Sequence, residues 1–262
     1  MVSARAVLDT MASDANVNPA NPGAQFFVFI RVILLSADLT NSVRAVIFDL
    51  DGTLVDTAGE IAAALNRTLE ELGLASLEQI AVEALIGRGV RSLVERALAM
   101  TEGGALIDVE AAVGRFEAHY AQTVGTDARL FAGVMPGLRR LAEAGVAMSV
   151  VTNKPRFFTE MLLERLEVAP MLKGVIAGDD GIRRKPHGDM LLAACERMGT
   201  APAASLMLGD SDNDVIAARA AGCPVWCVPY GYNEGRGPET LACDRLVQTI
   251  DEAARLIAPA AS

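Results

Sequence analysis

From Arg44 onward the chain alternates between short, continuous apolar runs and longer segments whose apolar residues recur every three or four positions. Continuous β-branched runs are typical of strands buried in a parallel sheet, and the longer segments are typical of amphipathic helices. The alternation therefore predicts an α/β fold, a parallel sheet covered by helices. The predicted strands are RAVIFDL (44–50), VAMSVVT (146–152), GVIAG (174–178), SLMLG (205–209), PVWCV (224–228) and a weaker one at 245–247. The predicted helices span 137–144, 155–166, 188–197, 212–221 and 251–257.

One long interval, from Asp56 to about Gly133, interrupts this alternation. It shows helical periodicity in four segments and no convincing strand. The segments are EIAAALNRTLEELGL, LEQIAVEALIG, VRSLVERALAM and VEAAVGRFEAHYAQTV. Helices inserted after the first strand would cover the carboxyl ends of the strands, where open α/β sheets bind ligands. We therefore expect a core made of residues 43–57 and 134–262, and an α-helical cap made of residues 58–133.

Residues 1–42 differ in composition from the rest of the chain. A polar stretch, SDANVNPANPG, is followed by the apolar run Phe26–Leu35, which Arg31 interrupts. This run is too short to span a bilayer, and the arginine inside it does not fit a signal peptide. We expect a disordered extension or a start codon placed too early, and a peripheral anchor is the alternative.

Charge and cysteine content restrict the partners. The chain has 33 acidic and 23 basic residues, a net charge of −10, which repels nucleic acid and anionic membrane surfaces, so we expect neither as a partner. The four cysteines form no C-x-x-C pair, which favours a reducing cytoplasm. The two histidines and the lack of H-E-x-x-H argue against a zinc site. A monomer and a homodimer both stay open.

Acidic residues gather at the ends of two predicted strands. The first strand ends in Asp49-Leu50-Asp51-Gly52-Thr53, and the fourth ends in Gly209-Asp210-Ser211-Asp212-Asn213-Asp214. An EF-hand calcium loop is excluded for the second cluster, because Val215 and Ala221 stand where that loop has its glycine and its glutamate. Several carboxylate oxygens without a soft ligand suit a hard ion that keeps some water, namely Mg²⁺.

Magnesium beside carboxylates indicates phosphoryl chemistry. Because the chain has neither a G-x-x-x-x-G-K loop nor a glycine-rich dinucleotide loop, this chemistry is not centred on ATP, and a phosphate monoester is the simplest substrate. A carboxylate held close to the metal can attack phosphorus in line. A second carboxyl group two residues along can give a proton to the departing alkoxide. Asp49 and Asp51 have that spacing.

Polar groups at two further strand ends can offset the charge of the ester. The second strand ends in Val151-Thr152-Asn153-Lys154, which offers a hydroxyl and exposed amides, and Lys185 precedes a helix near the third strand. Lys185, fixed by Pro186, is a compact charge that can reach a transferring phosphoryl oxygen. A solvated loop charge is the alternative for each basic residue taken alone.

Taken in order, these segments resemble the haloacid dehalogenase superfamily of phosphatases. DLDGTLVDT is similar to its first motif, VVTN to its second, Lys185 to its third and GDSDND to its fourth. The resemblance implies a Rossmann-like core with a helical cap inserted after the first motif. It implies that Asp49 is the nucleophile and Asp51 the general acid and base. It further implies that Mg²⁺ is held by Asp49, the backbone carbonyl of Asp51 and Asp210, with support from Asp214, and that phosphate is held by Thr152, the Asn153 amide and Lys185.

Within that superfamily the chain is most similar to bacterial phosphoglycolate phosphatases. The segments IGRGVRSLVERAL and YGYNEGR carry this likeness, whereas KPHGD departs from the KPHP usual in those enzymes. The resemblance implies hydrolysis of a small phosphorylated metabolite, 2-phosphoglycolate, to glycolate and phosphate. Because the core motifs recognise only phosphate and metal, the cap should set the specificity. Arg88, between Gly87 and Gly89, is a candidate to bind the substrate's carboxylate bidentately, and a solvated loop arginine is the alternative.

Other functions remain alternatives. Phosphatases acting on sugar phosphates and pyrophosphatases share the same core. Thr53 favours hydrolysis over a phosphomutase of this family, which usually has valine there, and Asp51 argues against a true dehalogenase. A non-catalytic regulator that binds a phosphorylated ligand would be expected to have lost Asp49, Asp51, Lys185 or Asp210, and all four are present.

Overall fold

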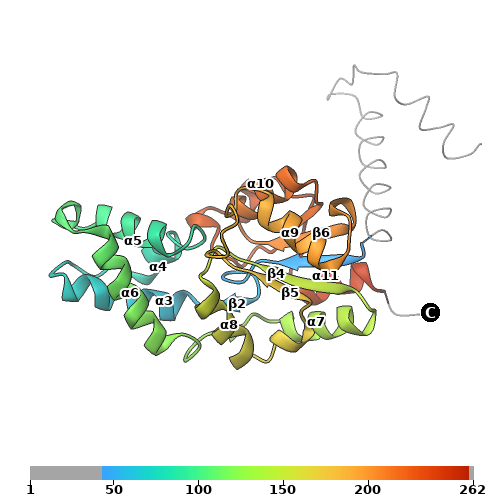
Figure 1. The fold of residues 1–262 in the computed structure, drawn as a ribbon, viewed down its shortest axis with the longest axis horizontal. Coiled ribbons are helices and arrows are strands. Elements are labelled where there is room, and N and C mark those ends of the chain that lie inside the picture. Colours follow the sequence, from blue (N-terminus) through green and yellow to red (C-terminus); the bar gives the residue numbers. More distant parts are fainter. Residues whose placement is uncertain (1–42, 260–262) are drawn as a thin grey trace, which may run out of the picture. The chain divides into compact units, whose positions relative to one another are not determined.

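The computed structural model describes residues 43–259 (Figure 1). A six-stranded parallel sheet forms the centre, in the order β5-β4-β1-β6-β7-β8. Its strands are β1 (Ala45–Phe48), β4 (Ala147–Val151), β5 (Gly174–Ile176), β6 (Ser205–Gly209), β7 (Val225–Cys227) and β8 (Arg245–Leu246). The α/β parallel sheet predicted from the apolar runs is confirmed, each predicted run containing one strand.

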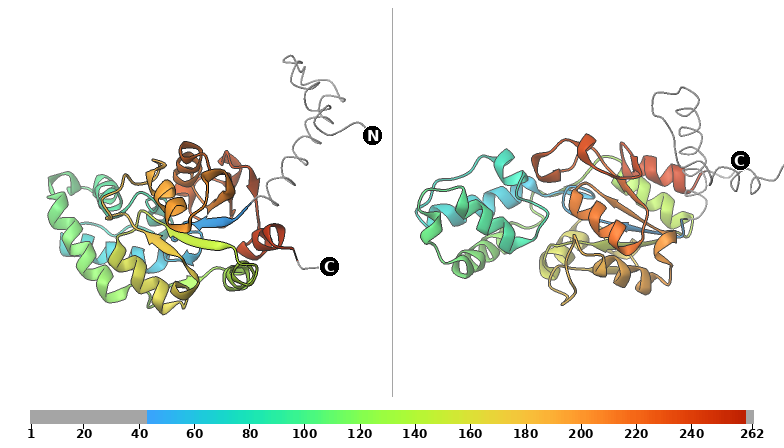
Figure 2. Two further views of the ribbon diagram at one scale, coloured as in Figure 1. Left: turned by 45° about the vertical axis from the view of Figure 1, so that its right-hand side comes forward. Right: turned by 90° about the horizontal axis from the view of Figure 1, so that it is seen from above.

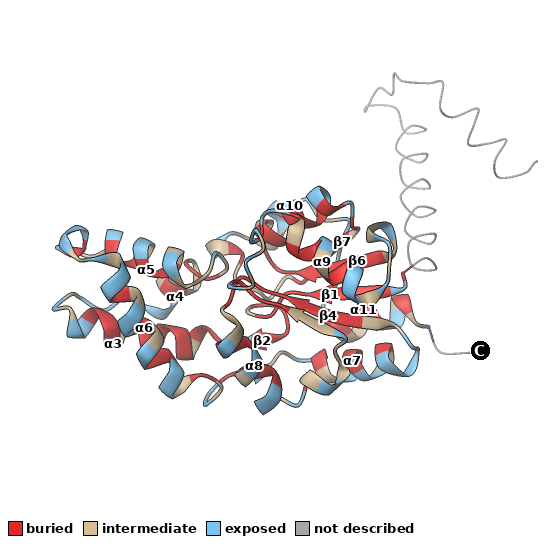
Figure 3. Ribbon diagram, in the orientation of Figure 1, coloured by how far each residue is buried: buried red, intermediate tan, exposed pale blue. Residues whose placement is uncertain are grey.

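Helices cover both faces of this sheet. The core helices are α7 (Val134–Glu143), α8 (Arg156–Arg165), α9 (Asp189–Met198), α10 (Asp212–Ala221) and α11 (Ile250–Ile257). Side chains of α9 and α10 pack with Ile47 on one face, while those of α7, α8 and α11 pack with Val46 and Phe48 on the other. This division follows from the alternation of side chains along a strand. Figure 3 shows the strands buried between the two helix layers.

Four α-helices lie between strand β1 and the core helix α7 in sequence. They are α3 (Ala58–Glu71), α4 (Gln79–Glu83), α5 (Val90–Ala99) and α6 (Val109–Thr123). Their apolar faces form one continuous buried cluster with the face of the sheet that carries Phe48. Figure 2 shows these helices grouped beyond the carboxyl ends of the strands. The short helix α4 ends at Glu83, earlier than the segment LEQIAVEALIG predicts, and turns follow it up to Gly87.

A short antiparallel ribbon was not predicted from the sequence. It pairs β2 (Val55–Asp56) with β3 (Arg129–Leu130), so the statement that no strand occurs between Asp56 and Gly133 is wrong at Arg129–Leu130. Two residues are too few to show the alternation that marks a strand. The ribbon joins the two chain segments that lead into and out of helices α3–α6.

The expectations for residues 1–42 lie outside the described residues. Within residues 43–259 no helix is both long enough and apolar enough to cross a membrane.

Candidate active site

Three neighbouring strands bring the predicted site residues to one edge of the sheet. Phe48, the last residue of β1, is paired with Val150 of β4 on one side and Leu208 of β6 on the other. The residues that follow these strands therefore lie side by side. They are Asp49 and Asp51 after β1, Thr152 and Asn153 after β4, and Asp210 after β6.

Asp49, Asp210 and Asp214 form a buried carboxylate cluster. One oxygen from each lies within 4.8 Å of the others, and all three residues are buried. Asp210 accepts hydrogen bonds from the Thr53 hydroxyl at 2.9 Å and the Tyr232 N–H at 2.8 Å. Asp214 belongs to the capping box that begins helix α10. Hydrogen bonds from two other segments thus fix Asp210, and the start of α10 fixes Asp214.

Glycine is required at one close approach in this cluster. Gly52 has a φ of 84°, and a Cβ there would lie 2.5 Å from Oδ2 of Asp210. Any larger residue would push the first acidic loop away from the second. The spacing Asp-x-Asp-Gly is therefore needed to bring the two predicted clusters together.

Lys185 supplies the positive charge in the centre of the cluster. Its Nζ lies 2.8 Å from Asp49 Oδ1 and 2.7 Å from Asp214 Oδ1, and its side chain is 1% exposed. Burial alone would lower the pKa of Lys185, but the carboxylates of Asp214 and Asp49 raise it above its ordinary value. The ammonium therefore stays charged.

The pKa values of the carboxyl groups in the cluster indicate that another positive charge would stabilise their ionised forms. Burial raises the pKa of Asp49 well above the usual carboxyl range; Lys185 lowers this pKa, and Asp214 and Asp210 raise it. Burial and the neighbouring Asp214 raise the pKa of Asp210 to about 7. Three clustered carboxylates, two of which pair with Lys185, carry more negative charge than this lysine offsets, and a divalent cation would offset the rest. Their hard oxygen donors fit such an ion.

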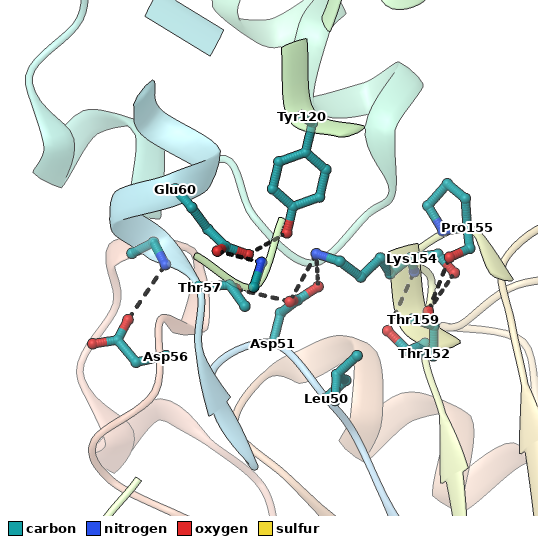
Figure 4. Close-up of polar contacts among 12 residues, drawn as sticks. Leu50, Asp51, Asp56, Thr57, Glu60, Tyr120, Thr152, Lys154, Pro155 and Thr159 are labelled. Atoms are coloured by element: carbon teal, nitrogen blue, oxygen red, sulfur yellow. Dashed lines mark hydrogen bonds and ion pairs between the residues drawn. The ribbon is translucent and has the colours of Figure 1, made fainter. Parts of the chain in front are cut away.

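Asp51 lies apart from this cluster and faces other partners. Its Oδ1 accepts a hydrogen bond from the Thr57 hydroxyl at 2.8 Å, and Lys154 Nζ lies 3.0 Å from Oδ1 and 3.2 Å from Oδ2 (Figure 4). The two acids that follow β1 are thus divided between two environments: Asp49 lies in the carboxylate cluster, and Asp51 lies beside Lys154.

The residues after β4 are fixed by hydrogen bonds to neighbouring loops. Thr152 is buried, and its Oγ accepts the Lys154 N–H at 3.2 Å. The Asn153 side-chain amide donates to the carbonyls of Gly87 and Lys185, both at 2.9 Å. Within residues 43–259 the Asn153 backbone N–H donates no hydrogen bond.

A pocket opens above these residues. It is lined by Asp49, Asp51, Thr152, Asn153 and Lys154, by Gly87 and Gly89, and by Ile61, Ile86, Val90, Leu93, Phe116 and Tyr120 from the segment 58–133. The core thus supplies the charged and polar lining residues, and the inserted helices supply the apolar ones.

Arg88 is the predicted residue that the structure does not bring to the others. Its Nη2 lies 2.8 Å from Glu234 Oε2, and its Nε pairs with Oε1 of the same carboxylate. The Arg88 side chain is 53% exposed and is not among the lining residues of the pocket. Its assignment as the residue that binds the substrate's carboxylate stays a prediction without geometric support.

Sequence reasoning missed two residues of the site, Lys154 and Tyr232. The Tyr232 hydroxyl accepts the N–H groups of Thr57 and Ala58 and donates to Asp56, so this tyrosine joins the start of α3 to the Asp210 loop. Its signal was the segment YGYNEGR. The signal for Lys154 was its rarity, because the chain has only three lysines.

A parallel sheet with acids clustered at its carboxyl edge and helices inserted after the first strand defines a Rossmann-like enzyme. Residues 46–228 match the family model of haloacid dehalogenase-like hydrolases, and the chain belongs to this family. It is 42% identical to a phosphoglycolate phosphatase of Nitrosospira multiformis over 82% of this chain and 96% of the relative. It is 40% identical to a phosphoglycolate phosphatase of Thiobacillus denitrificans over 83% of this chain and 97% of the relative.

A solved structure supports the same relationship. The crystal structure of a predicted phosphoglycolate phosphatase from Haemophilus somnus superposes with a TM-score of 0.78, at 27% identity, over 82% of this chain and 98% of that one.

Proposed function

We propose that this protein is a Mg²⁺-dependent phosphate monoester hydrolase that hydrolyses 2-phosphoglycolate through an aspartyl-phosphate on Asp49. The observation that carries this proposal is the convergence of Asp49, Asp210 and Asp214 around Lys185, beside a pocket that Asp49 and Asp51 line. The names of the relatives at about 40% identity support the choice of substrate.

Asp49 has one carboxylate oxygen held and one available. Oδ1 accepts the Leu50 N–H at 2.7 Å and contacts Lys185 at 2.8 Å. Among the described residues, no donor takes Oδ2. Oδ2 is therefore the oxygen that attacks phosphorus, because an attacking oxygen needs a free lone pair.

Asp51 transfers the protons. As the bond between phosphorus and the leaving oxygen breaks, Asp51 gives its proton to that oxygen. It then takes a proton from the water that attacks the aspartyl-phosphate, and this second step releases phosphate and restores Asp49. The Thr57 hydroxyl and Lys154 hold the Asp51 carboxyl group in place.

Donors after β4 and the ammonium of Lys185 hold the phosphoryl group. We infer that the Thr152 hydroxyl, the backbone N–H of Asn153 and Lys185 bind its oxygens. Mg²⁺ would be held by Asp49, Asp210 and the backbone carbonyl of Asp51, with support from Asp214, and would offset the charge of the phosphate ester. The segment 58–133 acts as the cap that covers the leaving group.

We propose that the protein works in a reducing cytoplasm. All four cysteines are free, which supports a reducing cytoplasm. A monomer or a homodimer stays a prediction.

Asp49→Asn tests the covalent mechanism. An amide has nearly the shape of the carboxylate but does not attack phosphorus, so release of phosphate from 2-phosphoglycolate with Mg²⁺ should fall to background. Asp127→Asn, on a side chain that is 73% exposed, is the matched control and should keep wild-type activity. Substantial hydrolysis by a folded Asp49→Asn protein would falsify the mechanism, and a wild-type preference for a sugar phosphate would overturn the substrate while leaving the chemistry.

A further inference from the structure

Lys154 places an ammonium group in the wall of the pocket. Its side chain is 5% exposed, and Nζ lies 4.7 Å from the centre of the Tyr120 ring as well as against Asp51 (Figure 4). Hydrogen bonds hold its backbone on both sides, since the Lys154 N–H donates to Thr152 Oγ and its carbonyl accepts the Gly178 N–H at 2.9 Å. The position of this charge is therefore set by the end of β4.

The ammonium has capacity for another anionic partner. Lysine has three N–H donors, and within residues 43–259 the hydrogen bonds of Nζ go to the single carboxylate of Asp51. The pocket residues around it from the inserted helices are apolar, among them Ile61, Leu93 and Phe116. A charge in such surroundings binds an opposite charge more strongly than it would in water.

The distances match a short leaving group that carries a carboxylate. The proposed proton donor, Asp51, must lie within about 3 Å of the ester's bridging oxygen. In an ester of a 2-hydroxy carboxylic acid, one carbon separates that oxygen from the carboxyl carbon, so the carboxylate oxygens lie only about 3 Å from it by ordinary bond lengths. Lys154 Nζ is 3.0 Å from Asp51. A carboxylate in that position would therefore lie within contact distance of the Lys154 ammonium.

Lys154 is also the one cationic residue among the pocket's lining residues in the described chain. Arg88, the other candidate for this role, pairs its guanidinium with the carboxylate of Glu234. A sugar phosphate would instead present neutral hydroxyl groups to the ammonium, whose charge would then face only the carboxylate of Asp51 and, at longer range, that of Glu60.

We propose that Lys154 binds the carboxylate of the leaving group and thereby makes the site selective for phosphate esters of short 2-hydroxy carboxylic acids. This inference rests on the proposed phosphatase function. It assigns to a residue of the core a part of the specificity that the cap alone would otherwise provide.

The test compares two esters of equal length, 2-phosphoglycolate and 2-hydroxyethyl phosphate, which lacks the carboxylate. Lys154→Gln still donates a hydrogen bond to Asp51 but carries no charge. Loss of a charge-assisted contact should lower the preference for 2-phosphoglycolate, measured as its kcat/KM divided by that of 2-hydroxyethyl phosphate, by about ten- to a hundredfold, mainly through KM for 2-phosphoglycolate. Lys154→Arg, which keeps the charge, should retain most of the preference.

Controls separate binding of the carboxylate from other roles. Lys173→Gln, at an exposed lysine before β5, should match the wild type on both esters. Melting curves show whether Lys154→Gln folds like the wild type. If it does not, Lys154→Met is the second variant. Equal losses on both esters would mean that Lys154 only positions Asp51, and no loss on either would remove it from the site; both outcomes overturn the inference.

Assays of the wild type alone distinguish a failure of the Lys154 inference from a failure of the proposed function. Equal kcat/KM for both esters would overturn the role of Lys154 and leave a phosphatase. Hydrolysis of neither ester would overturn the proposed function, and the inference with it.

Discussion

Replacing Lys185 by methionine should destabilise the protein more than any surface substitution, because it removes the charge that pairs with two buried carboxylates, Asp49 and Asp214. Each contact of Nζ, at 2.8 Å to Asp49 and 2.7 Å to Asp214, is worth about 6 kcal/mol of attraction at an effective dielectric constant of about 20. Burying the ammonium costs several kcal/mol and removes a large part of this gain. Breaking a buried pair by removing one partner typically costs about 3 to 5 kcal/mol, which is the loss we expect.

The measurement is unfolding by heat and by urea in the presence of EDTA. At about 2 to 4 °C per kcal/mol for a domain of this size, Tm should fall by roughly 6 to 20 °C. Lys173→Met, at an exposed lysine, is the matched control and should change stability by less than about 0.5 kcal/mol. Added Mg²⁺ should stabilise Lys185→Met more than the wild type, because the ion restores part of the missing positive charge.

Two results would refute this reasoning. A loss below about 1 kcal/mol in EDTA would mean that the buried carboxylates do not need the ammonium as a counter-charge. A deficit that Mg²⁺ leaves unchanged would mean that the ion does not bind among Asp49, Asp210 and Asp214.

The sequence was sufficient for the parts of the fold that local patterns encode. Strands β1, β4 and β6 are continuous apolar runs that the sheet buries on both faces, and helix α10 carries its own capping box and begins and ends where its pattern predicts. The order of the strands depends on packing between distant segments, which no local pattern records. The ribbon of β2 and β3 was missed for the same reason, since its two-residue strands are defined only by pairing with each other.

The residues of the site likewise fall into those that local patterns predict and those that only the folded chain brings together. Acids and glycines after strands were found from the sequence because turn chemistry and motif spacing are local. The surroundings of Asp51 were not, because Glu60, Tyr120 and Lys154 come from three separate elements and meet only in the folded chain. The pairing of Arg88 could not be predicted for the same reason, because its partner, Glu234, lies 146 positions away in the chain.

Two further predictions concern carboxyl groups beside the pocket, Asp51 and Glu60. Asp51→Asn should lower kcat by about 10²- to 10⁴-fold on alkyl phosphates but much less on p-nitrophenyl phosphate, because only a poor leaving group needs the proton; equal losses on both esters would argue against the acid role. Glu60 accepts hydrogen bonds from the Tyr120 hydroxyl and the Gly125 N–H, both at 2.8 Å. Burial raises the pKa of Glu60, and the bond from Tyr120 lowers it in part. A carboxyl group with a raised pKa in the folded state binds its proton more tightly than in the unfolded chain, so it adds stability below its unfolded pKa that is lost as pH rises through the folded pKa. Glu60→Gln keeps both hydrogen bonds, since the amide oxygen can accept from Gly125 and the amide nitrogen can donate to Tyr120, but it does not titrate. Its free energy of unfolding relative to the wild type should therefore increase as pH rises from about 4 to 8. Tyr120→Phe, which removes the donor that lowers the pKa of Glu60, should extend the wild type's loss of stability to higher pH. Urea unfolding across this pH range measures both differences, and a pH-independent difference for Glu60→Gln would show that burial does not perturb this carboxyl group.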